Sequence, residues 1–251
     1  MLKNVQQYGV DPRAARLIPD SMTNRNARFF GEIQELALQS TGTLQITIIP
    51  QFDGASLILN NQQYRTQNGD SLYIDLFRFY LSAIKMQGKN NACFVEQDSY
   101  HLFDAEEPGS HTMILNNVPA GRYDSLCFFV GTDSLTNVSG AMGGDLDPTK
   151  GMYWAWNSGY INIKLEGRSK SCQTRHNVFE FHIGGYMPPH QTVRRVVLPL
   201  KPLEIRGGET TSVRLIVDLG KFFSQIQLAE TNSLMIPSKQ ATQLADWFTG
   251  T

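Results

Sequence analysis

The sequence lacks a surplus of either charge and lacks long apolar runs. Lys and Arg total 22 and Asp and Glu total 23 in 251 residues, a formal net charge of −1. A protein that binds nucleic acid through its phosphates normally carries a basic surplus. No apolar run approaches the roughly 18 residues that a membrane-spanning helix needs. We therefore predict neither a nucleic-acid partner nor a membrane span.

Cysteine is scarce and its spacing is wide. Cys93, Cys127 and Cys172 are the only three, and no CxxC pair occurs among them. Zinc sites built from cysteine use closely spaced pairs, so the spacing argues against a site of that kind. One disulfide bond remains open as an alternative, but we favour three buried thiols.

The common catalytic motifs are also absent. The chain contains no GxSxG, no HExxH and no phosphate-binding GxxxxGK[ST] loop. The glycine-rich stretch "GTDSLTNVSGAMGG" lacks the GxGxxG spacing of a dinucleotide site. These absences argue against hydrolases of these classes and against a nucleotide-binding protein.

Residues 1–40 differ from the rest of the chain. The first 30 residues, "MLKNVQQYGVDPRAARLIPDSMTNRNARFF", have no apolar core of the kind found in signal peptides. The overlapping stretch "NARFFGEIQELALQ", which begins at Asn26, places apolar residues at helical spacing. We predict an N-terminal arm with one short helix over residues 1–40, followed by a single β-rich domain over residues 41–251.

From residue 43 the pattern changes to the period of two that is typical of strands. "TLQITIIP" reads as a strand ended by Pro50, and "DSLYIDLFRFYLSAIKMQG" as one long strand. Near the C-terminus, Ser238 is a good cap for a short helix in "SKQATQLADWFTGT". We predict an all-β antiparallel sandwich or a related Greek-key fold, with a short helix near each end. Further strands are expected in "ACFVEQ", "SYHLFD", "HTMILNNV", "RYDSLCFFVGT", "YINIKLEG", "HNVFEFHIGG", "QTVRRVVLPL" and "TSVRLIVDLG".

One polar segment, "TDSLTNVSGAMGGDLDPTKG", is longer than a passive connection usually runs. Its carboxylates Asp133, Asp145 and Asp147 are the hard oxygen ligands that calcium prefers, although their spacing does not match an EF-hand. Asp147 before Pro148 is also a typical turn start, and we favour that interpretation.

The stretch "HNVFEFHIGG" carries two of the five histidines. As a strand it places His176, Glu180 and His182 on one face, while Phe179 and Phe181 point into the core. A carboxylate beside a histidine can hold one tautomer and present the other ring nitrogen to a metal. A histidine that simply hydrogen-bonds the backbone is the alternative.

The stretch "GMYWAWNSGY" holds two of the three tryptophans. If it is extended, Met152, Trp154 and Trp156 share one face. They could pack between sheets, stack on a sugar ring together with Tyr160, or flank a metal with Met152 as a soft ligand.

The segment "LDPTKGMYWAWNSGYINIKLEG", followed by "FEFHIGGY", resembles the MbnP-type copper-binding proteins, relatives of surface copper proteins from methane-oxidising bacteria. The resemblance covers roughly residues 41–247. It implies an exported, β-rich protein of the periplasm or cell surface with a role in copper homeostasis, and not an enzyme. It also implies Cu(I) or Cu(II) held by two histidines and by kynurenine, which is made from a tryptophan. A di-haem partner enzyme, related to cytochrome c peroxidase and MauG, would be the oxidant.

Carried over to this chain, His182 matches the histidine of the "FHIGG" motif. Trp154 and Trp156 are the candidates for oxidation, with Trp154 favoured, and Met152 and His176 are further candidate ligands. The tryptophan motif itself offers no obvious second histidine, because position 156 is Trp. The histidines left to replace it are His176, His190 and His111.

A second function class stays open at this stage. Trp154, Trp156 and Tyr160 could form the stacking platform of a carbohydrate-binding β-sandwich, or could pack in a surface-assembly module.

Overall fold

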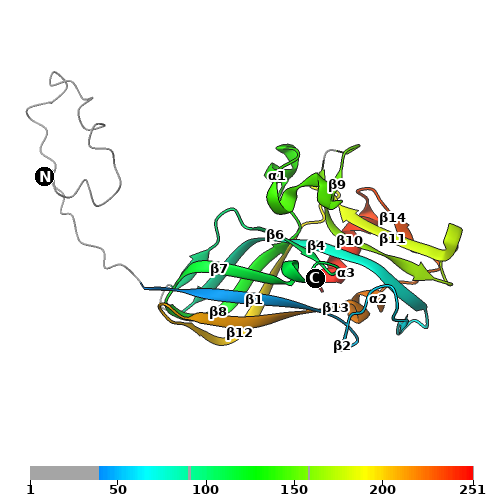
Figure 1. Cartoon of the computed structure of the whole chain (residues 1–251). Helices are drawn as coiled ribbons and strands as arrows, with labels where there is room; N and C mark the ends of the chain where they lie inside the picture. The colour runs from blue at the N-terminus through cyan, green and yellow to red at the C-terminus, as the bar shows by residue number, and fades with distance from the viewer. Residues whose placement is uncertain (1–39, 90–91, 158, 251) are drawn as a thin grey trace, which may run out of the picture. The chain divides into compact units, whose positions relative to one another are not determined.

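The computed structural model describes residues 40–89, 92–157 and 159–250 (Figure 1). The expected N-terminal arm and helix, residues 1–40, lie outside these residues except for Ser40. The described residues belong to one compact unit that is mostly β-structure.

The first sheet is built around β1 (Thr41–Phe52). Its inward-facing Leu44, Ile46 and Ile48 are buried, as the alternation predicts. We expected this strand to end at Pro50, but β1 continues through the proline to Phe52. The ladder of β1 with β7 ends at Thr47 and its ladder with β2 begins at Gln51, so Pro50 lies between the two, where its missing N–H is tolerated. The partners of β1 are β2 (Ala55–Ser56), β7 (Thr112–Pro119) and β13 (Thr210–Asp218).

The second sheet is organised by the long strand β4 (Ser71–Gly88), which the sequence predicts. The N-terminal half of β4 pairs with β10 (Gly159–Ser169), and its C-terminal half pairs with β8 (Gly121–Val130). The remaining strands of this sheet are β3 (Tyr64–Arg65), β5 (Cys93–Val95), β6 (Tyr100–Asp104), β9 (Tyr153–Trp154), β11 (Val178–Gly184), β12 (Arg194–Ile205) and β14 (Ser233–Leu234).

A buried polar junction lies where β8 and β10 meet beside β4. The side chain of Asn162 accepts a hydrogen bond from the backbone N–H of Thr132 at 3.0 Å and donates one to Thr192 Oγ1 at 2.9 Å. All three residues are buried, and buried polar groups of this kind are normally paired. The junction fixes the start of β10 against the loop that follows β8.

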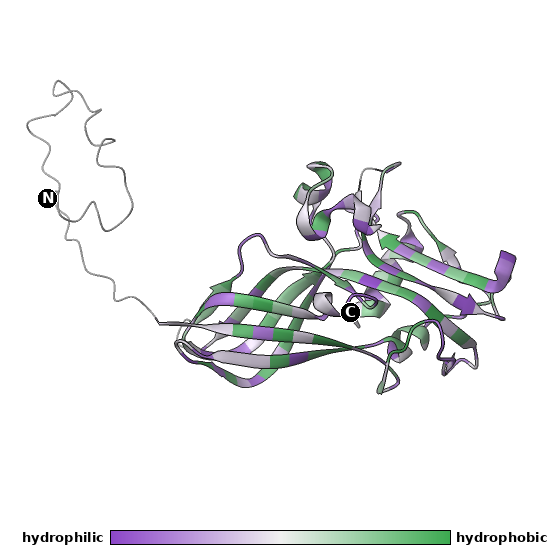
Figure 2. Cartoon of the chain, in the orientation of Figure 1, coloured by the Kyte–Doolittle hydropathy of each residue, from purple (hydrophilic) through white to green (hydrophobic). Residues whose placement is uncertain are grey.

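The core lies between the sheets and under two helices, α2 (Leu219–Phe223) and α3 (Lys239–Thr249). Phe222 of α2 packs edge-on against Phe248 of α3, with ring centroids 5.8 Å apart. Figure 2 shows hydrophobic and hydrophilic residues alternating along many strands. The side chain of Ser238 accepts the N–H of Ala241 and caps α3, which confirms the predicted C-terminal helix.

The prediction of a purely antiparallel sandwich is wrong in one respect. Both sheets are open and mixed, since β13 runs parallel to β1 and β14 runs parallel to β11. Alternation along a strand indicates which side is buried but contains no information on strand direction. This explains why the sequence pattern could not predict the two parallel pairs.

Two further expectations concern membranes and cysteines. None of the helices in the described part of the chain has the length and apolar character to cross a membrane. All three cysteines are free, and Cys127 and Cys172 are buried as expected, but Cys93 is exposed.

Candidate metal centre

β11 presents two chemically different faces. Phe179, Phe181 and Ile183 point into the core and are fully buried. Because side chains alternate along a strand, Glu180, His182 and Gly184 lie on the opposite, outer face. The outer face of β11 is where the sequence placed the candidate ligand His182.

His182 is paired with a carboxylate from the neighbouring strand. Its Nε2 lies 2.7 Å from Oε1 of Glu166 on β10, and the His182 residue is only 8% exposed. An ionised carboxylate can only accept, so Nε2 carries a proton, and in the neutral imidazole Nδ1 then keeps its lone pair. Carboxylate–histidine pairs of this kind orient imidazole ligands in metal sites.

The charge state of Glu166 follows from its surroundings. The hydrogen bond from His182 lowers the pKa of the Glu166 carboxyl group, and the nearby cation Lys164 adds to this effect against the opposing effect of burial. Lys164 Nζ lies 3.5 Å from the same Glu166 oxygen. Glu166 therefore stays ionised as the acceptor for His182 at neutral pH.

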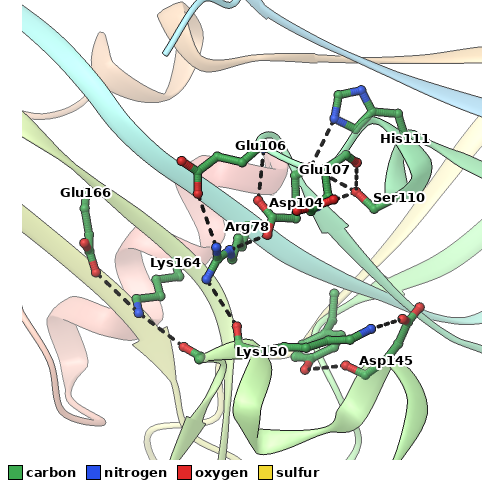
Figure 3. A network of polar contacts seen from close by, with 12 residues as sticks. Arg78, Asp104, Glu106, Glu107, Ser110, His111, Asp145, Lys150, Lys164 and Glu166 are labelled. Atoms are coloured by element: carbon green, nitrogen blue, oxygen red, sulfur yellow. Dashed lines mark hydrogen bonds and ion pairs between the residues drawn. The ribbon is translucent and has the colours of Figure 1, made fainter. Parts of the chain in front are cut away.

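Two cations fix the chain just before β9. Arg78 Nη1 donates to the backbone carbonyl of Lys150 at 3.2 Å, and Lys164 Nζ donates to that of Gly151 at 3.2 Å (Figure 3). Arg78 is itself held by Asp104, with Nε 2.7 Å from Oδ2. The short segment that leads into the tryptophan stretch is thereby attached to the outer face of β4 and β10.

β9 then folds back on the start of β10, and this places Trp154. The register pairs Trp154 with Gly159 and Tyr153 with Tyr160. The indole of Trp154 lies against Gly184: a Cβ atom at that glycine would be only 2.7 Å from Cζ3 of the ring. Gly184 and His182 share a face about 6.6 Å apart, at two residues of strand rise. The structure therefore brings Trp154 and His182 to the same face of β11.

The two tryptophans differ sharply in exposure. Trp154 is 6% exposed and Trp156 is 64% exposed, and their ring centroids lie 5.5 Å apart. Trp156 thus provides an aromatic surface directly beside an almost buried indole.

Met152 and Tyr160 belong to a small second core beneath β9. Met152 is fully buried there, together with Tyr80, Leu146 and Tyr160. The Tyr160 hydroxyl accepts the N–H of Met142 at 3.0 Å and donates to the carbonyl of Leu146 at 2.9 Å. The thioether of Met152 is enclosed in this core, and Tyr160 does not contribute to an exposed aromatic platform.

Two of the other candidate histidines lie elsewhere, whereas the backbone of His190 lies beside Gly185, where an added Cβ atom would clash with the His190 carbonyl oxygen. His176 is in an exposed turn (η7, Arg175–Asn177) with a φ of 68°, beyond the far end of β11 from Gly184. His111 stacks on Phe103, with ring centroids 4.9 Å apart. In the part of the chain that is described, no group of three or more His, Cys, Asp or Glu side chains is arranged to hold a metal. Near Gly184, the outer face of β11 therefore carries the His182 imidazole and its carboxylate partner Glu166 beside the Trp154 indole.

The carboxylates of the long polar loop have structural partners. Asp133 accepts the N–H of Thr136 at the start of α1 (Ser134–Val138), and Asp147 accepts that of Thr149. Asp145 pairs with Lys150 at 2.6 Å. These contacts agree with the interpretation of Asp147 as a turn start.

Glu166 and Gly184 were missed as part of the site. The alternation of "YINIKLEG" already places Lys164 and Glu166 outward, which was a usable signal. Their relation to His182 additionally requires the register between β10 and β11, in which Lys164 lies opposite His182. Register of this kind is not encoded in either segment alone.

Comparison with known proteins identifies the family. A model of the MbnP family matches residues 41–236 of this chain. Among solved structures, MbnP from Methylosinus trichosporium is similar in fold, with a TM-score of 0.52 and 15% sequence identity over 74% of this chain and 78% of that chain. No curated protein matches significantly. Since the family match spans well over half of the sequence, the chain belongs to the MbnP family.

Proposed function

We propose that this chain is a non-catalytic copper-binding protein that holds the ion at the outer face of β11, beside His182. Membership of the MbnP family supports copper as the ion. The observation that carries the proposal is the placement of Trp154 against Gly184, on the same face as an imidazole whose tautomer is set by Glu166. The same family membership supports an extracytoplasmic location.

The donor atoms fit copper in part. A neutral imidazole nitrogen is a good copper ligand, and Nδ1 of His182 is the nitrogen left available by the Glu166 pair. An intact indole is a poor ligand, and Met152 is enclosed in the small core. Oxidation of Trp154 to kynurenine would add an amine and a carbonyl oxygen on the same face.

Trp154 is our proposed site of oxidation because its ring lies against Gly184, on the face of β11 that carries His182. Trp156, in contrast, is 64% exposed. We further propose a di-haem enzyme as the oxidant. Since Trp154 is only 6% exposed, such a partner would approach the surface formed by Trp156, whose ring lies 5.5 Å from that of Trp154.

Titration of Cu(I) against a competing chelator tests the ligand assignment. Protein produced together with the di-haem partner should bind one ion per chain, and His182→Ala should weaken binding by at least roughly 100-fold. His176→Ala, which removes an exposed imidazole beyond the other end of β11, is the matched control and should leave affinity unchanged. Unaltered affinity in His182→Ala would refute the assignment.

Mass spectrometry tests the modification. The peptide that contains Trp154 should gain two oxygen atoms and lose carbon monoxide when the partner is present, and a Trp154→Phe variant should stay unmodified. Modification of Trp156 with Trp154 intact would reverse the assignment between the two rings.

A further inference from the structure

The two sheets leave an open side between β12 and β13. β12 is the edge strand of the second sheet and β13 is the edge strand of the first. The two strands are joined by a turn in which the N–H of Glu209 donates to the carbonyl of Arg206. A cleft of about 640 Å³ opens between the sheets here and extends to the C-terminal end of α3.

The walls of the cleft are apolar. Leu198 of β12, Leu215 and Val217 of β13, and Trp247 and Phe248 of α3 line it. The inward-facing residues of these edge strands are only partly buried, whereas Ile46 in the middle of the first sheet is fully buried. Apolar surface left in contact with water favours a ligand that covers it. The volume lies in the range of small-molecule binding sites.

One cation lies at this cleft. Lys221 of α2 lines the cleft and is exposed, and in the described part of the chain it forms no ion pair. The other charged lining residue is Asp218, whose carboxylate accepts the backbone N–H groups of Asp53, Gly54 and Gly220. Asp218 is therefore occupied as a cap, and Lys221 is the charge that remains for a ligand.

We propose that this cleft binds a single-chain amphiphile with an anionic head, of the class of long-chain fatty acids. The alkyl chain lies against the apolar side chains between the two sheets, and the carboxylate pairs with Lys221. A carbohydrate does not suit such walls, because they offer few groups that could replace its hydrogen bonds to water. The proposal is independent of copper binding on β11.

Calorimetric titration of the full chain with palmitate tests the proposal. We expect saturable binding of one palmitate per chain below its micellar concentration, and much weaker binding of hexanoate because it buries less alkyl surface. Tryptophan fluorescence should shift on binding, and Trp247→Phe should remove the shift while calorimetric binding persists.

Paired substitutions test the role of the cation. Lys221→Gln should weaken palmitate binding by roughly fivefold and leave binding of the uncharged hexadecanol unchanged. Lys239→Gln removes the same charge at the other end of α3 and should have no effect. Cu(I) affinity should be the same in the unsubstituted protein, Lys221→Gln and Lys239→Gln. This comparison separates a failure of the fatty-acid proposal from a failure of the copper-site proposal.

Three results would overturn the proposal. The first is the absence of saturable palmitate binding, and the second is equal affinity for palmitate and hexanoate. The third is a dimer in sedimentation that fatty acid does not dissociate and that Leu215→Glu disrupts, since this would assign the cleft to a second copy of the chain.

Discussion

The two faces of β11 serve different purposes. The inner face, Phe179, Phe181 and Ile183, packs against aromatic rings of α2, with 5.5 Å between the ring centroids of Phe179 and Phe223. The outer face carries His182 and Gly184, which are covered by a carboxylate and an indole. The same strand thus contributes to the hydrophobic core on one side and to the candidate metal centre on the other.

The two faces also differ in what covers them. Large-scale aromatic packing covers the inner face, whereas the cover of the outer face is held by the small second core around Met152 and by hydrogen bonds from Arg78 and Lys164. Small clusters with few buried contacts open at lower free energy than large packed cores. We infer that the outer face opens more readily, as a site that takes up an ion requires.

The largest effect on stability is expected on the inner face. Phe181→Ala should lower the free energy of unfolding by about 3–5 kcal/mol, because it removes a fully buried ring and leaves a cavity. Val197→Ala, at an exposed position of β12, should change it by less than about 0.5 kcal/mol. Urea denaturation measures both, and a loss below about 1 kcal/mol for Phe181→Ala would contradict this account of the core.

The second-largest effect concerns the contact between Trp154 of the tryptophan stretch and Gly184 at the end of β11. Gly184→Ala should displace the Trp154 indole and cost about 1–3 kcal/mol, because the new Cβ would lie 2.7 Å from the ring. Gly109→Ala is the matched control, since a Cβ there meets no atom within 4 Å. We expect a red shift of tryptophan fluorescence and weaker Cu(I) binding only for Gly184→Ala. If Gly184→Ala changed neither the fluorescence nor the Cu(I) affinity, the indole would not need this glycine.

A smaller effect is expected from loosening the cover of the outer face. Lys164→Met removes the hydrogen bond to the Gly151 carbonyl and should cost about 1 kcal/mol. Hydrogen exchange of the amides at residues 152–154 should become faster, while that of Phe179 and Phe181 should not change. Equal acceleration on both faces would mean that they open together.

The smallest effect is the pH dependence of the Glu166–His182 pair. The folded pKa of Glu166 lies below its usual value of 4.5, so the pair's stabilising contribution is present above that value. It is lost as the pH falls through the lowered folded pKa. In Glu166→Gln this part of the acid dependence should be missing, whereas Glu230→Gln at the surface should keep it. Denaturation midpoints measured from pH 6 downwards provide the comparison.

The sequence predicts local structure in this fold better than it predicts pairing. The alternation in β4 and the cap at Ser238 were sufficient to predict a long strand and the C-terminal helix. The parallel placement of β13 beside β1 depends on how distant strands meet, which alternation does not reveal. The exposure of Cys93 was missed for a related reason, because burial at a sheet edge depends on which neighbours cover it.

The same distinction holds for the candidate site. Period-two spacing correctly assigned Glu180 and His182 to the face opposite the phenylalanines, but it was wrong for His176, which lies in the turn before β11 begins at Val178. The Glu166–His182 hydrogen bond depends on the register between β10 and β11, and the Trp154–Gly184 contact depends on β9 folding back. Met152, Trp154 and Trp156 do not form one continuous exposed face because β9 has only two residues, Tyr153 and Trp154.

X-ray absorption of the copper-loaded protein, compared with that of His182→Ala, tests the central claim most directly. Our account predicts nitrogen and oxygen ligands with the multiple-scattering pattern of one imidazole, and loss of that pattern in the variant. A sulfur ligand, or an imidazole pattern that persists without His182, would contradict a copper site on the outer face of β11.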